Sequence, residues 1–327
     1  MTERSWDKTY TAAAQSIYAA LQYTDKKDDY SLIDVMGLTG HAFRINIHPA
    51  DVSPAGPTMF SPMELLEKGL NLLGFRCEQL HGFRTPAPPE KLEQAIRFAQ
   101  ETIDRGIPAI GWSLFIPEFG VIYGYDDELQ ELYCKDPSHD GPLPYAKLNE
   151  LPLNFVFMLR ILESVPSDLV QALTGALERA IQFAHEEAPT LSKEYRHGLA
   201  GYDAWIQAFQ SRTVNPFGNA YNAEVVGDAR EFAAQFLKTL PDRWSGVKEI
   251  GEPFRELARE AGKHYEQVAE VFRQFQQRFP HPHGGEPNDP EQAREAIRLL
   301  ELAKQSEALG VAVLERMYED ISIAVGR

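Results

Sequence analysis

The spacing of hydrophobic residues changes character once along the chain, after Pro166. Before that point, stretches with apolar side chains every three or four positions alternate with short stretches in which apolar and polar residues alternate. The first pattern is typical of amphipathic helices and the second of half-buried strands. Helices are predicted at 6–23, 30–36, 61–74 and 88–106, and strands at 42–47, 75–80, 107–112, 119–125, 129–136 and 154–162.

The second half of the sequence has only the helical pattern. Long amphipathic segments are separated by short breaks rich in proline and glycine, such as TVNPFGN (213–219) and PHPHGGEPNDP (280–290). Long helices with short connections favour an antiparallel bundle. The sequence therefore predicts an α+β domain at 1–165 with an antiparallel sheet, followed by an all-α bundle at 166–327. The bundle helices are expected at 167–187, 190–211, 218–240, 252–279 and 288–324.

Composition and charge narrow the classes of partner. Hydrophobic residues make up 43% of the chain and charged residues 24%, as in ordinary globular proteins. The formal net charge of −16 disfavours nucleic acid and anionic membranes as partners. The polar N-terminus and the absence of a long apolar run predict no signal peptide and no membrane span. With Cys77 and Cys134 as the only cysteines, we expect no disulfide framework and a cytoplasmic location.

Three segments of the first half follow a known order of elements. A helix leads into YTDKKDDYSLIDVMGLTGHAF (23–43), a second helix runs into a strand in LLEKGLNLLGFRCEQL (65–80), and EFGVIYGYDDELQELYCKDP (118–137) contains a strand, a turn, a strand and Asp-Pro. In this order the region 8–162 resembles the papain-like fold of C39-type cysteine peptidases, and in particular the N-terminal domain of the butirosin-biosynthesis H family, which transfers acyl groups.

The catalytic residues of that family are only partly present. Its members use a cysteine at the start of the first helix, a strand histidine that accepts the thiol proton, and an Asp or Asn that orients the histidine. Here the cysteine position falls near Thr11 or Ala12, in TYTAAAQ. The histidine position, six residues before Gly124, is Glu118, while Asp136 occupies the place of the orienting residue. The resemblance therefore implies a degenerate papain-like domain, a pseudoenzyme without thiol chemistry.

The same stretch contains a candidate binding site. Glu118 and Asp136 flank two strands joined by a turn, so their carboxylates are expected near one another. Such a pair could carry out acid–base chemistry if one pKa were raised, or bind a cation. Trp112, Tyr123 and Tyr125 are candidates for an aromatic wall that would suit an amine. The alternative is a glutamate that meets arginine or solvent, with aromatic residues in the core.

Further binding candidates lie elsewhere in the sequence. Thr11 begins the first helix, where threonine is commonly a helix cap, and His41 follows two glycines that permit close approach of a ligand. Asn219, Tyr221 and Asn222 crowd a helix start in the bundle, as pocket-lining residues or as a cap with core contacts.

No metal is predicted as the leading interpretation. His185, His197 and His264 lie in the helical half and form a weak alternative site for zinc or nickel. Their spacing lacks the pairs three or four residues apart that place two ligands on one helix face.

The leading hypothesis is a non-catalytic protein that binds a small molecule or peptide in a cleft between the two domains, lined by carboxylate and aromatic groups, without a cofactor. A second hypothesis is a hydrolase or an acyl or amide transferase that uses the Glu118–Asp136 pair or a metal. A third is a protein-interaction scaffold that presents an apolar stripe of the bundle. A homo-oligomer is compatible with each.

Overall fold

The computed structural model describes residues 9–188, 191–243, 247 and 250–324. Within them the chain forms two compact units, one built from residues up to 35 and 66–166, the other from 36–65 and the residues after 166. The boundary between the two units after Pro166 coincides with the change in hydrophobic pattern. Residues 36–65, which the pattern placed with the first domain, belong instead to the helical unit. The α+β class predicted from the sequence is confirmed.

The sheet of the first unit has the strand order β2-β7-β3-β4-β5-β6, with every neighbouring pair antiparallel. The strands predicted near 75–80, 107–112, 119–125, 129–136 and 154–162 all form. The strand Asp140–Pro144 was not predicted, because its two prolines and glycine lower strand propensity; its place at the sheet edge tolerates them. The strands are β2 (Phe75–Phe83), β3 (Ala109–Trp112), β4 (Phe119–Asp126), β5 (Glu131–Lys135), β6 (Asp140–Pro144) and β7 (Val156–Ser164).

Two helices of the first unit pack on this sheet. They are α1 (Ala12–Leu21) and α4 (Pro89–Asp104), and α4 contacts strands β2, β3, β4 and β7. Its buried face carries Ala95, Phe98 and Ala99, which join Met158 and Ile122 of the sheet in one hydrophobic core. The buried face accounts for the helical spacing of apolar residues at 88–106, from which this helix was predicted.

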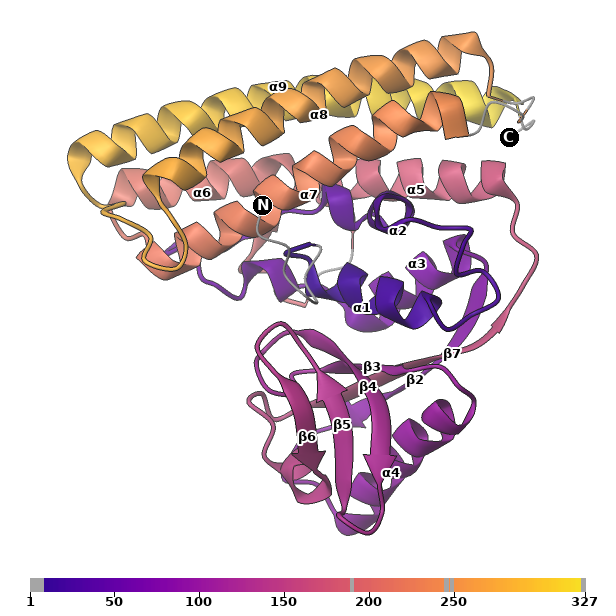
Figure 1. Cartoon of the computed structure of the whole chain (residues 1–327). Coiled ribbons are helices and arrows are strands. Elements are labelled where there is room, and N and C mark those ends of the chain that lie inside the picture. The colour runs from indigo at the N-terminus through magenta and orange to yellow at the C-terminus, as the bar shows by residue number, and fades with distance from the viewer. Residues whose placement is uncertain (1–8, 189–190, 244–246, 248–249, 325–327) are drawn as a thin grey trace. The chain divides into compact units, whose positions relative to one another are not determined.

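The second unit is a bundle of long helices (Figure 1). Helices α7 and α8 run side by side, α8 packs in turn on α9, and the shorter α5 and α6 both pack on α9. Its core is rich in aromatic residues, with Trp205, Phe209, Phe272 and Phe275 all buried. None of the described helices combines the length and the apolar character needed to cross a membrane. The bundle helices are α5 (Leu169–Ala184), α6 (Leu199–Ser211), α7 (Pro216–Arg243), α8 (Glu252–Arg278) and α9 (Pro290–Ala324).

Two predicted elements of this unit are wrong in part. Residue 190, where a helix over 190–211 was expected to start, lies outside the described residues. From 191 on, the helix begins only at Leu199, because Gly198 has a φ of 60° and the two preceding residues, Arg196–His197, form a short strand, β8. The strand expected over 42–47 reduces to Asn46–Ile47, β1, which pairs with β8. The residues before it form a single 3₁₀ turn, η1 (His41–Phe43), after Gly40 with a φ of 78°. Both positive φ values favour glycine.

Residues 36–65, which belong to the helical unit, begin and end inside helices. This segment starts within α2 (Leu32–Leu38) and ends within α3 (Pro62–Leu72). Its loop is fixed to the start of α7, where Asn215 N donates to Asp51 O at 2.8 Å and Asn222 Nδ2 donates to Ser53 O at 3.0 Å. The segment is therefore a structural part of the bundle.

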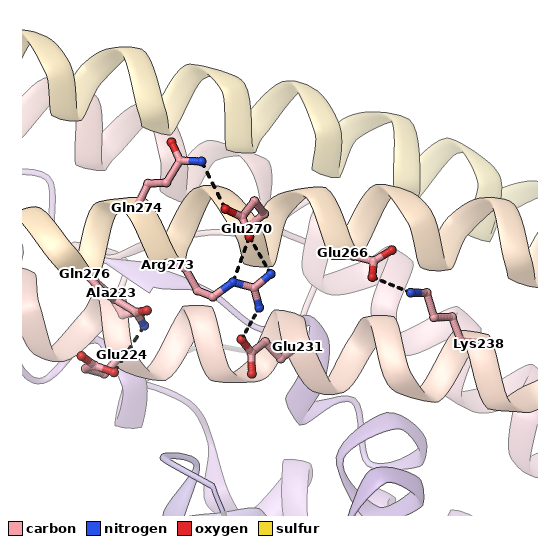
Figure 2. A network of polar contacts seen from close by, with 9 residues as sticks. All are labelled: Ala223, Glu224, Glu231, Lys238, Glu266, Glu270, Arg273, Gln274 and Gln276. Carbon is pink, nitrogen blue, oxygen red and sulfur yellow. Dashed lines mark hydrogen bonds and ion pairs between the residues drawn. The ribbon is translucent and has the colours of Figure 1, made fainter. Parts of the chain in front are cut away.

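Exposed polar contacts join α7 and α8 along one side (Figure 2). Arg273 bridges Glu231 of α7 and Glu270 of its own helix at 2.7 and 2.8 Å, and Lys238 pairs with Glu266 at 2.6 Å. Each exposed pair contributes roughly 0–1 kcal/mol, so the aromatic core dominates the packing of these helices.

Candidate functional site

The carboxylate of Asp136 has a structural role in the loop that it caps. Its Oδ2 accepts hydrogen bonds from the backbone N–H groups of Phe115 and Ile116, each at 3.0 Å. Its Oδ1 accepts from Ser138 N and Oγ at 2.8 Å and from His139 N at 3.0 Å. Asp136 is 2% exposed. A ligand at this carboxylate would have to compete with five local donors.

Glu118 lies at the same end of the sheet as Asp136. Strand β4 begins just after Glu118 and β5 ends just before Asp136, and the two strands are paired antiparallel. The backbone of Glu118 closes a turn by accepting from Ser113 N at 2.8 Å. The paired strands thus place the two residues at the same end of the sheet. With Asp136 already bonded on both oxygens, the arrangement gives no support to an acid–base pair.

The aromatic candidates of the first unit are engaged with local partners. Tyr123 donates its hydroxyl to Asp140 at 2.8 Å, and Tyr125 donates to Asp104, the last residue of α4, at 2.9 Å. Burial, together with the hydrogen bond to Asp140, raises the pKa of Tyr123 to about 12. Trp112 packs on Phe119 with ring centroids 4.7 Å apart.

Neither the threonine candidate nor the cysteines form a nucleophilic site. Thr11 precedes α1, and its buried Oγ1 makes no cap and has no partner among the described residues. Cys77 and Cys134 lie in strands β2 and β5. Burial raises the pKa of the Cys77 thiol to about 12 and raises that of Cys134 as well, which keeps both thiols protonated at neutral pH.

The asparagine candidates of the bundle hold structure together. Asn219 Oδ1 accepts from the indole N–H of Trp205 at 2.8 Å, and Asn222 fixes the 48–60 loop. Tyr221 lies nearer the surface, where its ring stacks on Phe217 at 6.2 Å with an angle of 8° between the planes.

The described residues contain no group of three or more His, Cys, Asp or Glu side chains that could hold a metal ion. His185 faces Glu315 at 2.7 Å, and His264 lies beside Gly310. His197 is buried elsewhere, in β8. The structure therefore does not gather these three histidines into the metal site that the sequence left as an alternative.

A buried ion pair that the sequence gave no sign of joins helices α7 and α9 of the helical unit. Arg230 of α7 and Glu307 of α9 are 0% and 1% exposed and form two hydrogen bonds, at 2.8 and 2.5 Å. Tyr202 donates its hydroxyl to the same carboxylate at 2.6 Å. Arg230 Nη1 donates to the backbone oxygens of Ala42 and Arg44 at 3.1 and 2.9 Å. The pair is thus satisfied on both sides, and it fixes the η1 turn to the bundle.

A second buried guanidinium, that of Arg179 in α5, lacks such compensation. Arg179 is 8% exposed, and its Nη2 donates to Leu65 O at 3.2 Å. Its Nη1 has no hydrogen-bond partner in the described part of the chain. The side chain passes Gly40, where a Cβ would lie 3.7 Å from its Nε, and the Phe183 ring lies 5.8 Å from its Cζ. No described carboxylate forms an ion pair with Arg179.

Arg44, which follows the η1 turn, adds a third positive charge. Its Cζ lies 4.0 Å from the centroid of the Phe60 ring, and its Nη2 reaches Pro57 O at 3.5 Å. The side-chain oxygen of Asn46 accepts from Arg44 Nη2 at 2.6 Å, and its amide nitrogen donates to Ile45 O at 3.2 Å. These are neutral partners, and among the described residues no carboxylate pairs with it. Burial, and the nearby charges of Arg179 and Arg230, lower the pKa of Arg44 to about 9.

Two buried histidines border these arginines. His41 Nδ1 lies 2.6 Å from Thr39 Oγ1, and its ring meets the Phe60 ring edge-on at 6.2 Å. His41 Nε2 and both ring nitrogens of His197 are buried and have no partner among the described residues. Burial is the main cause that lowers the pKa of each histidine, and the positive charge of Arg44 adds to it, so both are neutral at pH 7.

We call Arg44, Arg179, His41 and His197 the arginine–histidine cluster. It offers two positive charges without described counter-ions and buried ring nitrogens without described partners. Unpaired buried charge is costly, and such a set suits recognition of an anion. Sequence reasoning found His41 but missed the arginines, because Arg44 and Arg179 are far apart in the chain and follow no spacing rule.

Comparison of the chain with protein-family models finds no match, and neither does comparison with curated proteins.

Proposed function

We propose that this protein is a non-catalytic binding protein whose helical unit takes a small anionic molecule at the arginine–histidine cluster. One observation carries the proposal: the guanidinium of Arg179 is buried, and one of its nitrogens has no hydrogen-bond partner among the described residues. Arg44, equally without a described carboxylate, lies close enough for its charge and that of Arg179 to repel. An anion bridging the two would remove that repulsion and supply acceptors.

The first unit fits the same proposal as a degenerate papain-like domain. What supports this is the resemblance of the sequence at 8–162 to that fold, together with the absence of a cysteine and a histidine at the matching catalytic positions. Thr11 stands at the start of α1, and both cysteines are strand residues whose pKa is raised. Since a protonated thiol is a poor nucleophile, we expect no peptidase or acyl-transfer activity through cysteine.

The test is thermal unfolding of the full chain with inorganic phosphate, sulfate, methyl phosphate or succinate, against chloride at the same ionic strength. At least one probe should raise the Tm in a concentration-dependent way, because a ligand that binds only the folded state stabilises it. The Arg179→Met variant should lose this response. Methionine has a similar length and no charge, and circular dichroism verifies that the helices remain.

Arg298→Met is the matched control, because Arg298 is an exposed arginine of α9 paired with Glu295. Its response to the anions should equal that of the wild type. Failure of all four probes to stabilise the wild type would sink the proposal, and so would an equal response in Arg179→Met.

A further inference from the structure

We infer that the arginine–histidine cluster selects a doubly charged oxyanion, such as a phosphate monoester or a dicarboxylate, over a singly charged one. The inference rests on the proposed function and adds the charge class of the ligand. It follows from the charges of the described side chains that surround the cluster.

The charge count begins with the groups that compensate one another. Arg230 is matched by Glu307 through two hydrogen bonds, so this pair adds no net charge. On the other side, Glu186 is matched by Arg196, which forms an ion pair with it next to His197. Arg44 and Arg179 remain, each without an ion-pair partner in the described part of the chain.

The histidines leave this count unchanged. Burial and the neighbouring arginines hold the pKa of His41 well below its ordinary value, and the pKa of His197 is lowered too. Neutral imidazoles contribute hydrogen bonds without charge. If Thr39 donates to His41 Nδ1, the proton of His41 lies on Nε2, which is buried and has no described acceptor. The cluster thus presents two charges and additional neutral donors.

The two charged groups meet at one short turn, one directly after it in the chain and the other from helix α5. Arg44 follows η1 directly, and Arg179 lies against Gly40, the residue before that turn. Arg230 fixes the turn from the other side through the oxygens of Ala42 and Arg44. Arg230 thus fixes the backbone that carries Arg44, and the bond to Leu65 O holds Arg179. Because both guanidinium groups have partners that position them, a ligand need not organise them, and the charge difference between a dianion and a monoanion is available for selection.

The two positive charges give a dianion a clear advantage. A monoanion would leave one of the two guanidinium groups uncompensated, whereas a dianion neutralises both. A cationic ligand would add to the repulsion already present. Guanidinium groups bind carboxylate and phosphate in the same bidentate manner, so the shared property of the ligand is its charge of two.

The experiment is isothermal titration calorimetry on the full chain at pH 8 and constant ionic strength, with two matched pairs of probes. Methyl phosphate, a dianion at this pH, is compared with dimethyl phosphate, a monoanion. Succinate is compared with its monomethyl ester. We expect at least one dianion to bind ten or more times as tightly as its matched monoanion. The dianion that binds more tightly shows whether the ligand is a phosphoryl compound or a dicarboxylate.

The Arg44→Met variant then removes one of the two charges. It should lower the preference for the dianion to threefold or less while the monoanion still binds. Equal affinity for mono- and dianions in the wild type would overturn this inference and leave the proposed function standing. Absence of binding by all four probes would overturn this inference, and it would overturn the proposed function too if inorganic phosphate and sulfate also fail to raise the Tm. An unchanged preference in Arg44→Met would show that the selectivity does not arise from this arginine.

Discussion

At the scale of single residues, the helical unit contains two buried arginines with opposite surroundings. Arg230 has a carboxylate partner and two backbone acceptors, whereas Arg179 has one backbone acceptor and a nitrogen without a described partner. Removing one member of a buried pair leaves an uncompensated charge, but removing an uncompensated charge relieves the fold. The two residues should therefore respond to substitution in opposite directions.

Without ligand, Arg179→Met should stabilise the protein by about 0.5–2 kcal/mol, the range of substitutions that trade function for stability. The reason is that the buried charge and its unsatisfied nitrogen both disappear. Urea unfolding followed by circular dichroism measures the effect. Arg230→Met should instead destabilise by about 3–5 kcal/mol, because Glu307 loses its partner. Loss of stability in both variants would contradict a binding role for Arg179.

At the scale of elements, a single glycine, Gly198, determines where helix α6 begins. Gly198 has a φ of 60°, and a Cβ there would lie 2.1 Å from the oxygen of Phe183, at the end of α5. This close approach places β8, with His197, against α5. Helix α6 can therefore begin only after Gly198.

Gly198→Ala should destabilise the helical unit by more than about 2 kcal/mol, since backbone strain and a backbone clash act together. Gly285→Ala is the control, because its φ of 59° is nearly the same while its closest atom is 3.0 Å away. That variant should cost about 1 kcal/mol. Chemical unfolding measures both, and equal losses would mean that the contact with α5 is unimportant.

These elements also show what the sequence could reveal. The amphipathic spacing predicted α4, α7, α8 and α9, because a helix that buries one face has apolar residues every three or four positions. The pattern failed at 191–198 and 42–45, where glycine backbone and tertiary contacts override helix and strand propensity. Of the binding cluster, the sequence singled out His41 through its glycines and His197 as a possible pocket residue or metal ligand. Charge compensation depends on contacts distant in sequence, so neither arginine could be recognised.

At the scale of the whole molecule, the cluster gives the helical unit a distinct response to acid. His41 and His197 are neutral and buried in the folded state, and their pKa values are lowered by burial and by nearby arginine charge, although Glu186 partly opposes the shift of His197. In the unfolded chain both return to an ordinary pKa near 6.5. The unfolded state therefore binds more protons below that pH, and the folded state loses stability as the pH falls.

Between pH 7.5 and 5.5 the free energy of unfolding should drop by about 1–3 kcal/mol, a window above the titration of ordinary carboxylates. Urea unfolding at the two pH values measures the drop. The double variant His41→Gln with His197→Gln should remove most of it. His185→Gln, at an exposed histidine paired with Glu315, should leave it unchanged. A drop of the same size in the double variant would assign the acid response to other groups.

The anchoring of the η1 turn by Arg230 has a consequence for how the protein is made. The turn's acceptor at Ala42 and its donor at Arg230 are 188 residues apart, and Glu307 follows 77 residues later. At a translation rate of about 5–20 residues per second, roughly 10–40 seconds pass between synthesis of the turn and of its donor. The 36–65 segment therefore cannot form this contact until Arg230 has been synthesised. A fragment that starts after residue 166 would lack the part of the cluster that contains Arg44.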